Sequence, residues 1–513
     1  MPRAAARFRK YAILTHRWMG IAFCALFAMW FVSGMVLMYW DYPGVTPADR
    51  LARAALLHAA QIRLSPEEAF AALGPSEPPD EVRIATLAGR PAYRFRWGQD
   101  QSVVYADTGE VQPEFSPVLA LAAAAGWAGQ PAAAARFEGI LTEPDQWTVS
   151  GEFRALRPLF KYSWPDGVEV YVSRPTGEVV QSTTRGARVG AWFGAIPHWL
   201  YFTPLRRHGE LWSRVVIWVS GIGTAMCLFG LLVGILMFSP AKRYHFPEGF
   251  SRIPYAGQKR WHTMLGLIFG LVTCSWIFSG MLSMDPFGWE SSGQAFRLNR
   301  ALRGGALRPE AFAAKHPRQV LEQVTDIRVK ELVLTTFGGA PAYLAVETPR
   351  RSRIVPLTGS PVQEFNPDQA IQLLADAIQP YGLAEVRVVR EYESYYLDRH
   401  QERPLPVLFV RLRDPDNSMY YVDLKTARIV AGYVTQSRWN RWLYHGLHSM
   451  DLPWLYRHRP AWDIMVLALM LGGTALSVTA LVIGWRRLRR KLRMRTARAR
   501  LNQSRRALGN LTA

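Results

Sequence analysis

Cysteine is scarce in this sequence, with only three residues in a chain of 513. Cys24, Cys227 and Cys274 all fall inside long apolar segments, so no disulfide framework supports the rest of the chain. Each is most simply a small buried apolar residue. The segments outside the apolar stretches show no catalytic triad and no metal-binding cysteine pattern. We therefore expect neither a hydrolytic triad nor a cysteine-held metal there.

Acidic residues are in the minority. The chain has 40 Asp and Glu against 61 Lys and Arg, which gives a net charge of +21. In a soluble protein this excess would suggest nucleic acid, but here the basic residues cluster at the ends of apolar segments, as they do in cytoplasmic parts of membrane proteins. We expect membrane lipid as a partner, and no nucleic acid.

Four segments are apolar and long enough to cross a bilayer, which takes about 20 residues. The first does not fit a cleaved signal peptide, because its apolar run is too long and no small-residue cleavage site follows it. We expect it to remain as a membrane anchor. The four predicted transmembrane spans are 15–40, 212–238, 261–284 and 462–485.

Basic residues lie before the first span, between the second and third, and after the fourth. If the four helices alternate in direction, these three places share the cytoplasmic side, and the long segments lie outside, in a periplasm. The predicted regions between the spans are a cytoplasmic N-terminus (1–14), a periplasmic region (41–211), a basic cytoplasmic loop (239–260), a second periplasmic region (285–461) and a basic cytoplasmic tail (486–513).

The chain repeats itself. A motif of H-x-x-x-G followed by S-G-M begins at His16 and returns, with every internal spacing kept, at His262, an offset of 246 residues. Downstream the offset is 250, and it relates His198 to His448. Because both halves start on the same side, the repeats are parallel, with a pseudo-two-fold axis along the membrane normal. Equivalent residues then lie at equal depth.

The two long outer segments predict small α+β units. A helix begins after Ser65, which caps it, with proline at the first position. Residues 71–80 and 120–135 are expected to be connectors or short helices. The predicted strands, separated by glycine-containing turns, are 82–87, 92–96, 102–105, 168–172, 327–334, 342–347, 407–412 and 419–423, and residues 176–180 continue a strand-turn run after 168–172. The expected fold class is an α-helical membrane protein, with four transmembrane helices in two parallel repeats and α+β periplasmic domains.

Two of these patterns resemble a known family. The G-x-P-A-Y turn at Gly89 and the closing Y-A-D-T-G-E-V run at Tyr105 resemble the PepSY domain, and the H-x-x-x-G helices resemble the PepSY-associated transmembrane family. The resemblance covers nearly the whole chain except the tails and parts of the connectors. Members include ferric-siderophore reductases and iron-uptake proteins of bacterial inner membranes, with b-type haem in the membrane part. The resemblance therefore implies a multi-pass inner-membrane electron carrier with cytoplasmic termini, and it does not fix the substrate.

Two histidines stand at equal depth near the cytoplasmic ends of the first and third spans. A b-type haem that only transfers electrons needs two axial imidazoles on opposite faces of a flat ring. His16 and His262 meet this need, and each is followed one helical turn later by a glycine, Gly20 or Gly266, against which a porphyrin can lie. The alternative is that the glycines permit close helix packing around polar histidines. The duplication favours haem.

His198 and His448 each precede a later span by fourteen residues and predict a second haem near the outer surface. His445 lies three residues before His448 on the same helical face and has no counterpart in the first half, so it is kept as a substitute ligand. The arginines beside His208 and His458 suit haem propionates or lipid headgroups equally well. These propionate candidates are Arg206, Arg207 and Arg457.

Together these features predict a di-haem inner-membrane reductase, with two haem b, that passes electrons to a periplasmic acceptor. A ferric siderophore or other ferric chelate is the favoured acceptor. No glycine-rich nucleotide loop occurs on the cytoplasmic side, so the donor is a separate protein, a diffusible reductant or a quinol. Aromatic side chains between the haems are more often packing than an electron path: Phe27, Trp30, Trp218 and Trp276.

One stretch and two rival functions stay open. Residues 391–403 combine tyrosines with Arg399 and His400 and suit an anionic iron chelate, although an amphipathic edge explains them more simply. A haem-free PepSY protein with a regulatory or partner-binding role is the main alternative. A transporter is disfavoured, because the predicted spans carry few internal acidic residues and four helices leave little room for an aqueous path.

Overall fold

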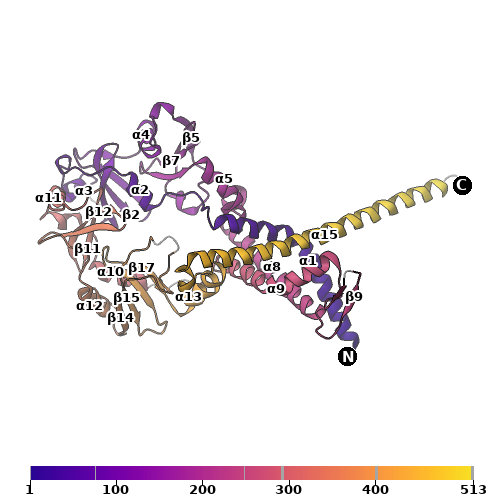
Figure 1. The fold of residues 1–513 in the computed structure, drawn as a ribbon. Helices are drawn as coiled ribbons and strands as arrows, with labels where there is room; N and C mark the ends of the chain where they lie inside the picture. The colour runs from indigo at the N-terminus through magenta and orange to yellow at the C-terminus, as the bar shows by residue number, and fades with distance from the viewer. Residues whose placement is uncertain (1, 75–76, 248, 290–293, 399–401, 510–513) are drawn as a thin grey trace.

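The computed structural model describes residues 2–74, 77–247, 249–289, 294–398 and 402–509. A bundle of four long helices carries a head made of β-sheets and short helices (Figure 1). The chain enters the head twice, between the first and second long helices and again between the third and fourth.

The long helices are α1 (Pro2–Leu37), α8 (Gly209–Met237), α9 (Gly257–Leu282) and α15 (Arg459–Gly509). Helices α1 and α9 each pack against both α8 and α15, which places α1 and α9 diagonally across the bundle. The strands β9 (Tyr244–Phe246) and β10 (Gly249–Ser251) form a hairpin between α8 and α9 at the end far from the head (Figure 1).

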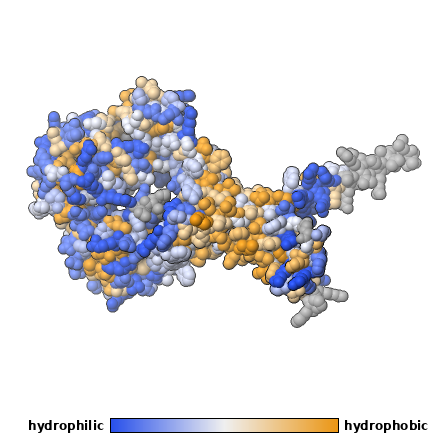
Figure 2. Space-filling model, in the orientation of Figure 1, coloured by the Kyte–Doolittle hydropathy of each residue, from blue (hydrophilic) through white to orange (hydrophobic). Residues whose placement is uncertain are grey.

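The outside of the bundle is apolar. Trp218, Leu271 and Ile464 are each 69% exposed, and Figure 2 shows an apolar band around the bundle between polar surfaces on the head and at the far end. The apolar windows of the four helices have mean hydropathies of 2.1, 2.1, 1.9 and 2.2. A surface of this kind is stable in lipid, where each helix satisfies its own backbone hydrogen bonds. The four predicted spans are confirmed as helices long and apolar enough to cross a membrane.

Two helices extend beyond the predicted spans. Helix α1 already begins at Pro2, and α15 continues to Gly509, well past the rest of the bundle (Figure 1). The flanking residues are mostly Ala, Arg, Lys and Leu. These are good helix formers although many are too polar for a bilayer. Hydropathy therefore located the apolar windows but not the ends of the helices.

A seven-stranded antiparallel sheet joins the two halves of the head. Its order is β13-β12-β11-β1-β2-β3-β4, and β1 pairs with β11, with Val82 opposite Leu334 and Ile84 opposite Leu332. This central pairing, between residues about half the chain apart, has no signal in the sequence. The strands are β1 (Glu81–Leu87), β2 (Arg90–Trp97), β3 (Asp100–Tyr105), β4 (Val111–Gln112), β11 (Glu331–Phe337), β12 (Ala340–Thr348) and β13 (Arg351–Pro356).

Two four-stranded antiparallel sheets complete the head. Helix α4 (Pro117–Ala128) buries Ala120 and Ala124 on one, while α10 (Gln294–Arg303) and α12 (Pro367–Ala377) share an apolar core with the other. The strands of the first are β5 (Arg136–Leu141), β6 (Leu159–Ser163), β7 (Glu169–Ser173) and β8 (Val179–Thr183); those of the second are β14 (Leu383–Val389), β15 (Val407–Leu412), β16 (Met419–Asp423) and β17 (Arg428–Tyr433).

Short helices link the sheets to each other and to the bundle. They are α2 (Pro47–Arg53), η1 (Ala59–Gln61), α3 (Pro66–Ala71), η2 (Ala132–Ala134), η3 (Gly151–Arg154), α5 (Arg185–Phe193), α6 (Ala195–Trp199), α7 (Thr203–Arg206), η4 (Pro309–Phe312), α11 (Pro317–Gln323), α13 (Thr435–Asn440), the π-helix η5 (Arg441–Gly446) and α14 (Pro453–Tyr456).

Most predicted strands are confirmed to within a few residues, and so is the cap of α3, where the Ser65 hydroxyl accepts from the Glu68 N–H at 3.2 Å. One boundary was wrong, because residues 327–330 precede β11. In the predicted strand-turn run, residues 176–178 lie outside any strand and β8 begins at Val179. Strands β4, β5, β6, β9, β10, β13, β14 and β17 were missed. Of these, β5 and β14 are sheet edges with few buried residues, so the apolar alternation that signals a strand is absent from them.

A partly buried charge cluster connects three parts of the head. Arg83 on β1 lies 2.5 Å from a carboxylate oxygen of Glu178 in the β7–β8 turn and 3.6 Å from one of Glu331 on β11. Arg94 on β2 is 3.6 Å from Glu178, and Arg50 on α2 pairs with Glu331. Burial alone would raise the pKa of Glu178, but the charges of Arg83, Arg94 and Arg50 lower it to about 2. The cluster therefore holds Glu178 ionised and ties both halves of the head together.

Candidate functional site

Two pairs of histidines face each other at the two ends of the bundle. His16 on α1 and His262 on α9 form the far-end pair, with ring centroids 6.2 Å apart and ring planes at 28°. His198 on α6 and His448, just after η5, form the head-end pair, with centroids 6.1 Å apart and planes at 54°. These are the partners that the two sequence offsets predict.

Hydrogen bonds fix the protonated nitrogen in the far-end pair. Nδ1 of His16 lies 3.3 Å from the carbonyl oxygen of Met226 on α8. A carbonyl only accepts, so this Nδ1 carries the proton. Nδ1 of His262 lies 3.0 Å from the hydroxyl oxygen of Thr479 on α15, and that hydroxyl donates to the carbonyl of Leu476 at 2.7 Å. Thr479 therefore accepts from His262, and in both rings Nε2 keeps its lone pair.

The head-end pair is held in the same tautomer by one arrangement used twice. Each Nδ1 meets a tryptophan carbonyl and a serine hydroxyl on α1 or α9, and each serine hydroxyl donates to that same carbonyl. The Nδ1 contacts are His198 with Trp30 O at 3.1 Å and Ser33 Oγ at 3.4 Å, and His448 with Trp276 O at 3.2 Å and Ser279 Oγ at 3.1 Å. Nε2 again keeps its lone pair.

Glycines make room for the rings. A Cβ added at Gly34 would lie 3.1 Å from Cε1 of His198, and one at Gly280 would lie 3.4 Å from Cε1 of His448. In the repeated S-G-M motif, serine thus accepts from the imidazole and glycine lets the ring approach. At the far end, a Cβ on Gly230 would come within 2.7 Å of Cε1 of His16. The sequence marked the S-G-M repeat but did not assign it this role.

One turn after each far-end histidine the helix surface is open. A Cβ added at Gly20 would meet nothing within 4 Å, and one at Gly266 would meet only Leu476, at 3.8 Å. Neither glycine is therefore needed for helix packing. This weakens the alternative in which these glycines serve close helix contact.

The spacing of each pair suits one metal ion between two imidazoles. A metal–imidazole bond is about 2.0–2.1 Å, and a ring nitrogen lies about 1.1 Å from the centroid of a ring built from bonds of ~1.33 Å. Two imidazoles on opposite sides of one ion therefore have centroids about 6.2–6.4 Å apart, close to the observed 6.2 and 6.1 Å. No group of three or more His, Cys, Asp or Glu side chains that could hold a metal ion occurs among the described residues.

Two tryptophans beside the head-end pair carry unsatisfied donors. The indole Nε1 atoms of Trp30 and Trp276 are buried, and within the described part of the chain neither has a hydrogen-bond partner. Buried indole N–H groups are ordinarily bonded. The two residues are related by the 246-residue offset. Two equivalent donors thus flank the pair without a protein acceptor.

The structure separates His445 from the pair. Its side chain is 49% exposed, and its Nδ1 lies 3.9 Å from a carboxylate oxygen of Asp451. Its ring centroid is 4.6 Å from that of Tyr444, while His448 is the histidine that faces His198. The preference for His448 over His445 agrees with this geometry.

The arginines predicted to contact propionates already have protein neighbours. Arg206 stacks on Trp212, with 4.4 Å from its Cζ to the ring centroid. Arg207 donates to Nε2 of His208 at 3.3 Å, and Arg457 lies 3.4 Å from a carboxylate oxygen of Glu391. None of these contacts involves the paired histidines.

The aromatic side chains predicted between the pairs differ in position. Phe27 and Trp276 are buried, at 4% and 6% exposure, whereas Trp218 faces outward. In the stretch 391–403, Arg399 and His400 lie outside the described residues. The ring of Tyr396 is fully buried and stacks on Tyr421 at 4.7 Å.

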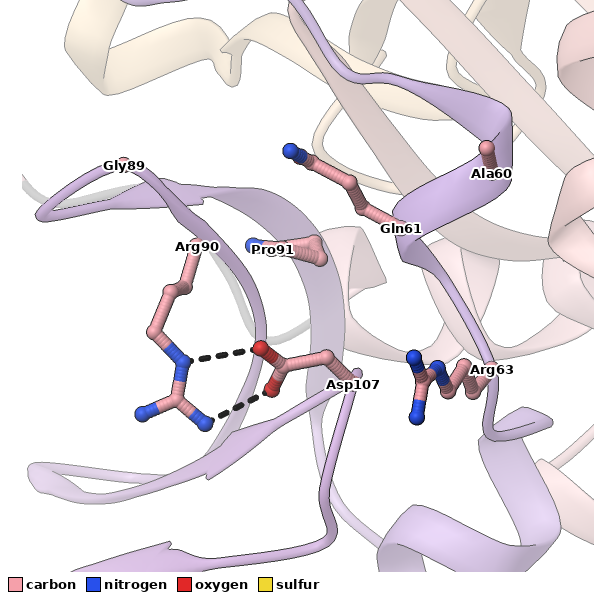
Figure 3. Close-up of a pocket in the computed structure, with 7 residues that line it drawn as sticks. All are labelled: Ala60, Gln61, Arg63, Gly89, Arg90, Pro91 and Asp107. Atoms are coloured by element: carbon pink, nitrogen blue, oxygen red, sulfur yellow. Dashed lines mark hydrogen bonds and ion pairs between the residues drawn. The ribbon is translucent and has the colours of Figure 1, made fainter.

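The G-x-P-A-Y turn of the first half borders a small pocket on the head (Figure 3). Arg90 and Asp107 form two hydrogen bonds of 2.8 Å there, so the carboxylate of Asp107 is already neutralised. The pocket measures about 180 Å³, below the ~300 Å³ of ordinary ligand sites. It is too small for a chelate of siderophore size, and the motif shapes a turn.

No curated protein matches this sequence. The family model described as the PepSY-associated TM region matches residues 13–330, a segment that contains most of α1, all of α8 and α9, the first half of the head and three of the four paired histidines. The chain is therefore a membrane protein that belongs to the PepSY-associated transmembrane family.

Proposed function

We propose that the protein is a di-haem reductase of a bacterial inner membrane that passes electrons to a periplasmic ferric chelate. One haem b would be held by His16 and His262, and the other by His198 and His448. The observation that carries the proposal is the distance between the ring centroids in the two histidine pairs, 6.2 Å in one and 6.1 Å in the other. Both distances match two axial imidazoles on one iron.

The hydrogen bonds around the four histidines support haem ligation. Metal-bound histidines almost always donate the other ring N–H to a carbonyl, carboxylate or water, which orients the ring. Here the Nδ1 atoms of His16, His198 and His448 have a backbone carbonyl as partner, and that of His262 has the hydroxyl of Thr479. Two protein ligands also suit haem better than zinc, which takes four ligands in structural sites and three in catalytic ones. The open backbone at Gly20 and Gly266 provides a flat surface one turn away.

The depth of the two pairs suits electron transfer across a membrane. Helix α1 carries His16 and, seventeen residues later, Ser33, which contacts the head-end His198. At 1.5 Å per residue the pairs are about 26 Å apart along the helix, nearly the ~30 Å of a hydrocarbon core. Bound haem would supply a one-electron Fe(III)/Fe(II) couple at each end. The protein holds the ligands rigid, so no moving part is required.

The charge distribution supports the proposed sides. The far end carries the basic residues, seen as polar surface in Figure 2, and the positive-inside rule places such an end in the cytoplasm. The head would then be periplasmic. The central pairing of β1 with β11 supports two parallel repeats, since a two-fold axis between these strands would relate Val82 to Leu332 and Ile84 to Leu334.

Absorption spectra of the detergent-purified protein, oxidised and dithionite-reduced, test the proposal when haem is quantified per chain. We expect close to two low-spin b-type haems. H16A or H262A should each remove one haem, and H198A or H448A the other. H458A is the matched control, because His458 also has a repeat partner, His208, and its Nδ1 bonds the nearby carbonyl of Trp454. A colourless protein, made with ample haem, would contradict the proposal and favour a partner-binding role.

A further inference from the structure

Nearly all of the net charge of the chain lies at the far end of the bundle. Residues 1–17, 239–260 and 486–513 hold 21 of the 61 lysines and arginines but only one of the 40 acidic residues, Glu248. The rest of the chain has 40 basic and 39 acidic residues and is therefore close to neutral. Because the electron donor is a separate molecule in the proposed function, this charge faces the side from which that donor arrives.

Helix α15 carries about half of this charge away from the bundle. Its last part, residues 486–509, which we call the basic arm, holds 11 of the 21 basic residues. The arm continues α15 as one helix and runs clear of the other three long helices (Figure 1). At 1.5 Å per residue it is about 36 Å long, whereas the headgroup layer of a bilayer is roughly 5–8 Å thick on each side. Most of the arm therefore lies beyond the reach of lipid headgroups and meets soluble molecules.

Within the arm, like charges stand one helical turn apart. Arg486 and Arg490 form such a pair, and so do Arg489 and Arg493. Each like-charge pair of this spacing destabilises a helix by about 0.2–0.5 kcal/mol. These four side chains are exposed, and the arm contains no acidic residue that could pair with them. A partner with an acidic surface would offset the repulsion, whereas salt only screens it.

The first turns of the arm lie close to the far-end histidine pair. Nζ of Lys491 is 4.2 Å from the ring centroid of Trp18 on α1, and Trp18 follows His16 by two residues. Leu488 and Leu492 lie one turn apart among the arginines and are 38% and 62% exposed. Apolar side chains surrounded by charged ones are typical of protein–protein interfaces. A protein held by the arm would therefore come close to the His16 end of the bundle.

We propose that the basic arm docks a small acidic protein that carries one electron. The inference rests on the proposed function and names the chemical class of its donor. One electron passes from the reduced carrier, which is thereby oxidised, to the ferric centre proposed between His16 and His262, which is thereby reduced. No bond forms between the two proteins. Opposite charges on two protein surfaces raise the rate of association by about 10- to 10³-fold, and salt lowers that rate steeply.

Binding is tested first, with flavodoxin as a small acidic one-electron carrier. The full-length protein is placed in nanodiscs of phosphatidylcholine, which has no net charge. The variant R489Q/R490Q/R493Q removes three charges of the arm and keeps good helix formers at these positions. At about 10 mM salt, where charges act over about 30 Å, titration with flavodoxin should show an affinity about tenfold or more below that of the parent protein.

The matched control removes the same number of charges from the head. R154Q/R300Q/R308Q changes three arginines that are exposed there. This control has the same net charge as the arm variant but an intact arm. It should bind flavodoxin like the parent protein.

Electron transfer is tested second, by the absorbance of the haem after rapid mixing with reduced flavodoxin. The second-order rate constant of R489Q/R490Q/R493Q should be about tenfold below that of the head control at about 10 mM salt. The difference should disappear at about 1 M salt, where charges act over about 3 Å. The methyl viologen radical, a small cation, should reduce the arm variant no more slowly than the parent protein, which shows that the haem itself is unchanged.

The docking site and the di-haem function fail separately. Equal affinities of the parent protein and R489Q/R490Q/R493Q would overturn the docking site even if two haems are present. An equal loss of affinity in the head control would also overturn it, because the net charge would then act from any position. Amide hydrogen exchange in the arm that slows with phosphatidylglycerol in the nanodisc, but not with flavodoxin, would identify anionic lipid as the occupant and overturn the proposal. Flavodoxin binding that depends on the arm in a haem-free protein would instead contradict the di-haem function and keep the docking site.

Discussion

Substituting alanine for Gly20 or for Gly266 distinguishes two roles of these glycines, a cleft for haem and close packing of helices. In the protein alone, the new methyl group at Gly20 meets nothing within 4 Å, and at Gly266 it makes one ordinary contact of 3.8 Å. Glycine inside a helix costs about 0.5–1 kcal/mol relative to alanine. Each substitution should therefore leave the haem-free protein at least as stable as the parent.

The same methyl groups should weaken the binding of haem. Each glycine lies four residues after a far-end histidine, one turn along the same face. A porphyrin ligated there would lie against the glycine, and overpacking typically costs about 1–3 kcal/mol. That corresponds to roughly 5- to 150-fold weaker binding. We expect G20A and G266A to lose much of one haem while the head-end haem remains.

The assay combines haem quantification with thermal unfolding of the detergent-purified variants. Gly484→Ala is the matched control, since its added Cβ would make an ordinary 3.5 Å contact with Ile21 on α1. It should keep both haems. Full haem content with an unchanged spectrum in both G20A and G266A would refute a porphyrin resting on these glycines. Loss of stability in the haem-free variants would refute the claim that this surface is free of packing.

Three further predictions concern residues that hold charges or histidines. Thr479→Val removes the hydroxyl that accepts from His262 Nδ1 at 3.0 Å, so the affinity for the far-end haem should fall about 10- to 100-fold. The rate of haem transfer to apomyoglobin measures this affinity. An unchanged rate would contradict the role of Thr479 in orienting His262. Because the folded pKa of Glu178 is about 2, below its ordinary 4.5, its stabilisation is present above pH 4.5 and lost as pH falls toward 2. Glu178→Gln should lower the free energy of unfolding by about 3 kcal/mol at pH 7 and make the dependence of Tm on pH flatter below pH 5. Equal Tm values of variant and parent at pH 7 would contradict this stabilising role of Glu178. Ser279→Ala should perturb the head-end haem potential more than Ser33→Ala, because the Ser279 contact is 3.1 Å and that of Ser33 is 3.4 Å; equal potentials would count against it.

The sequence determined those features that are local or that repeat. Apolar length located the four long helices, because about 20 apolar residues are needed wherever a helix crosses lipid. Serine, proline and glutamate in fixed order determined the start of α3. The offsets of 246 and 250 residues selected the histidine partners His16 with His262 and His198 with His448, since equivalent positions meet across a two-fold arrangement.

Tertiary structure alone decided the rest. The pairing of β1 with β11 joins distant parts of the chain, and edge strands such as β5 lack the buried alternation that reveals a strand. The hydrogen-bond acceptors of His16, His198 and His448 include backbone carbonyls. Because every residue has a backbone carbonyl, the residue types in the sequence could not predict these acceptors. The π-helix that carries Tyr444 and His445 outward likewise depends on how the chain is packed against α9, because a register change in a helix has no fixed sequence code.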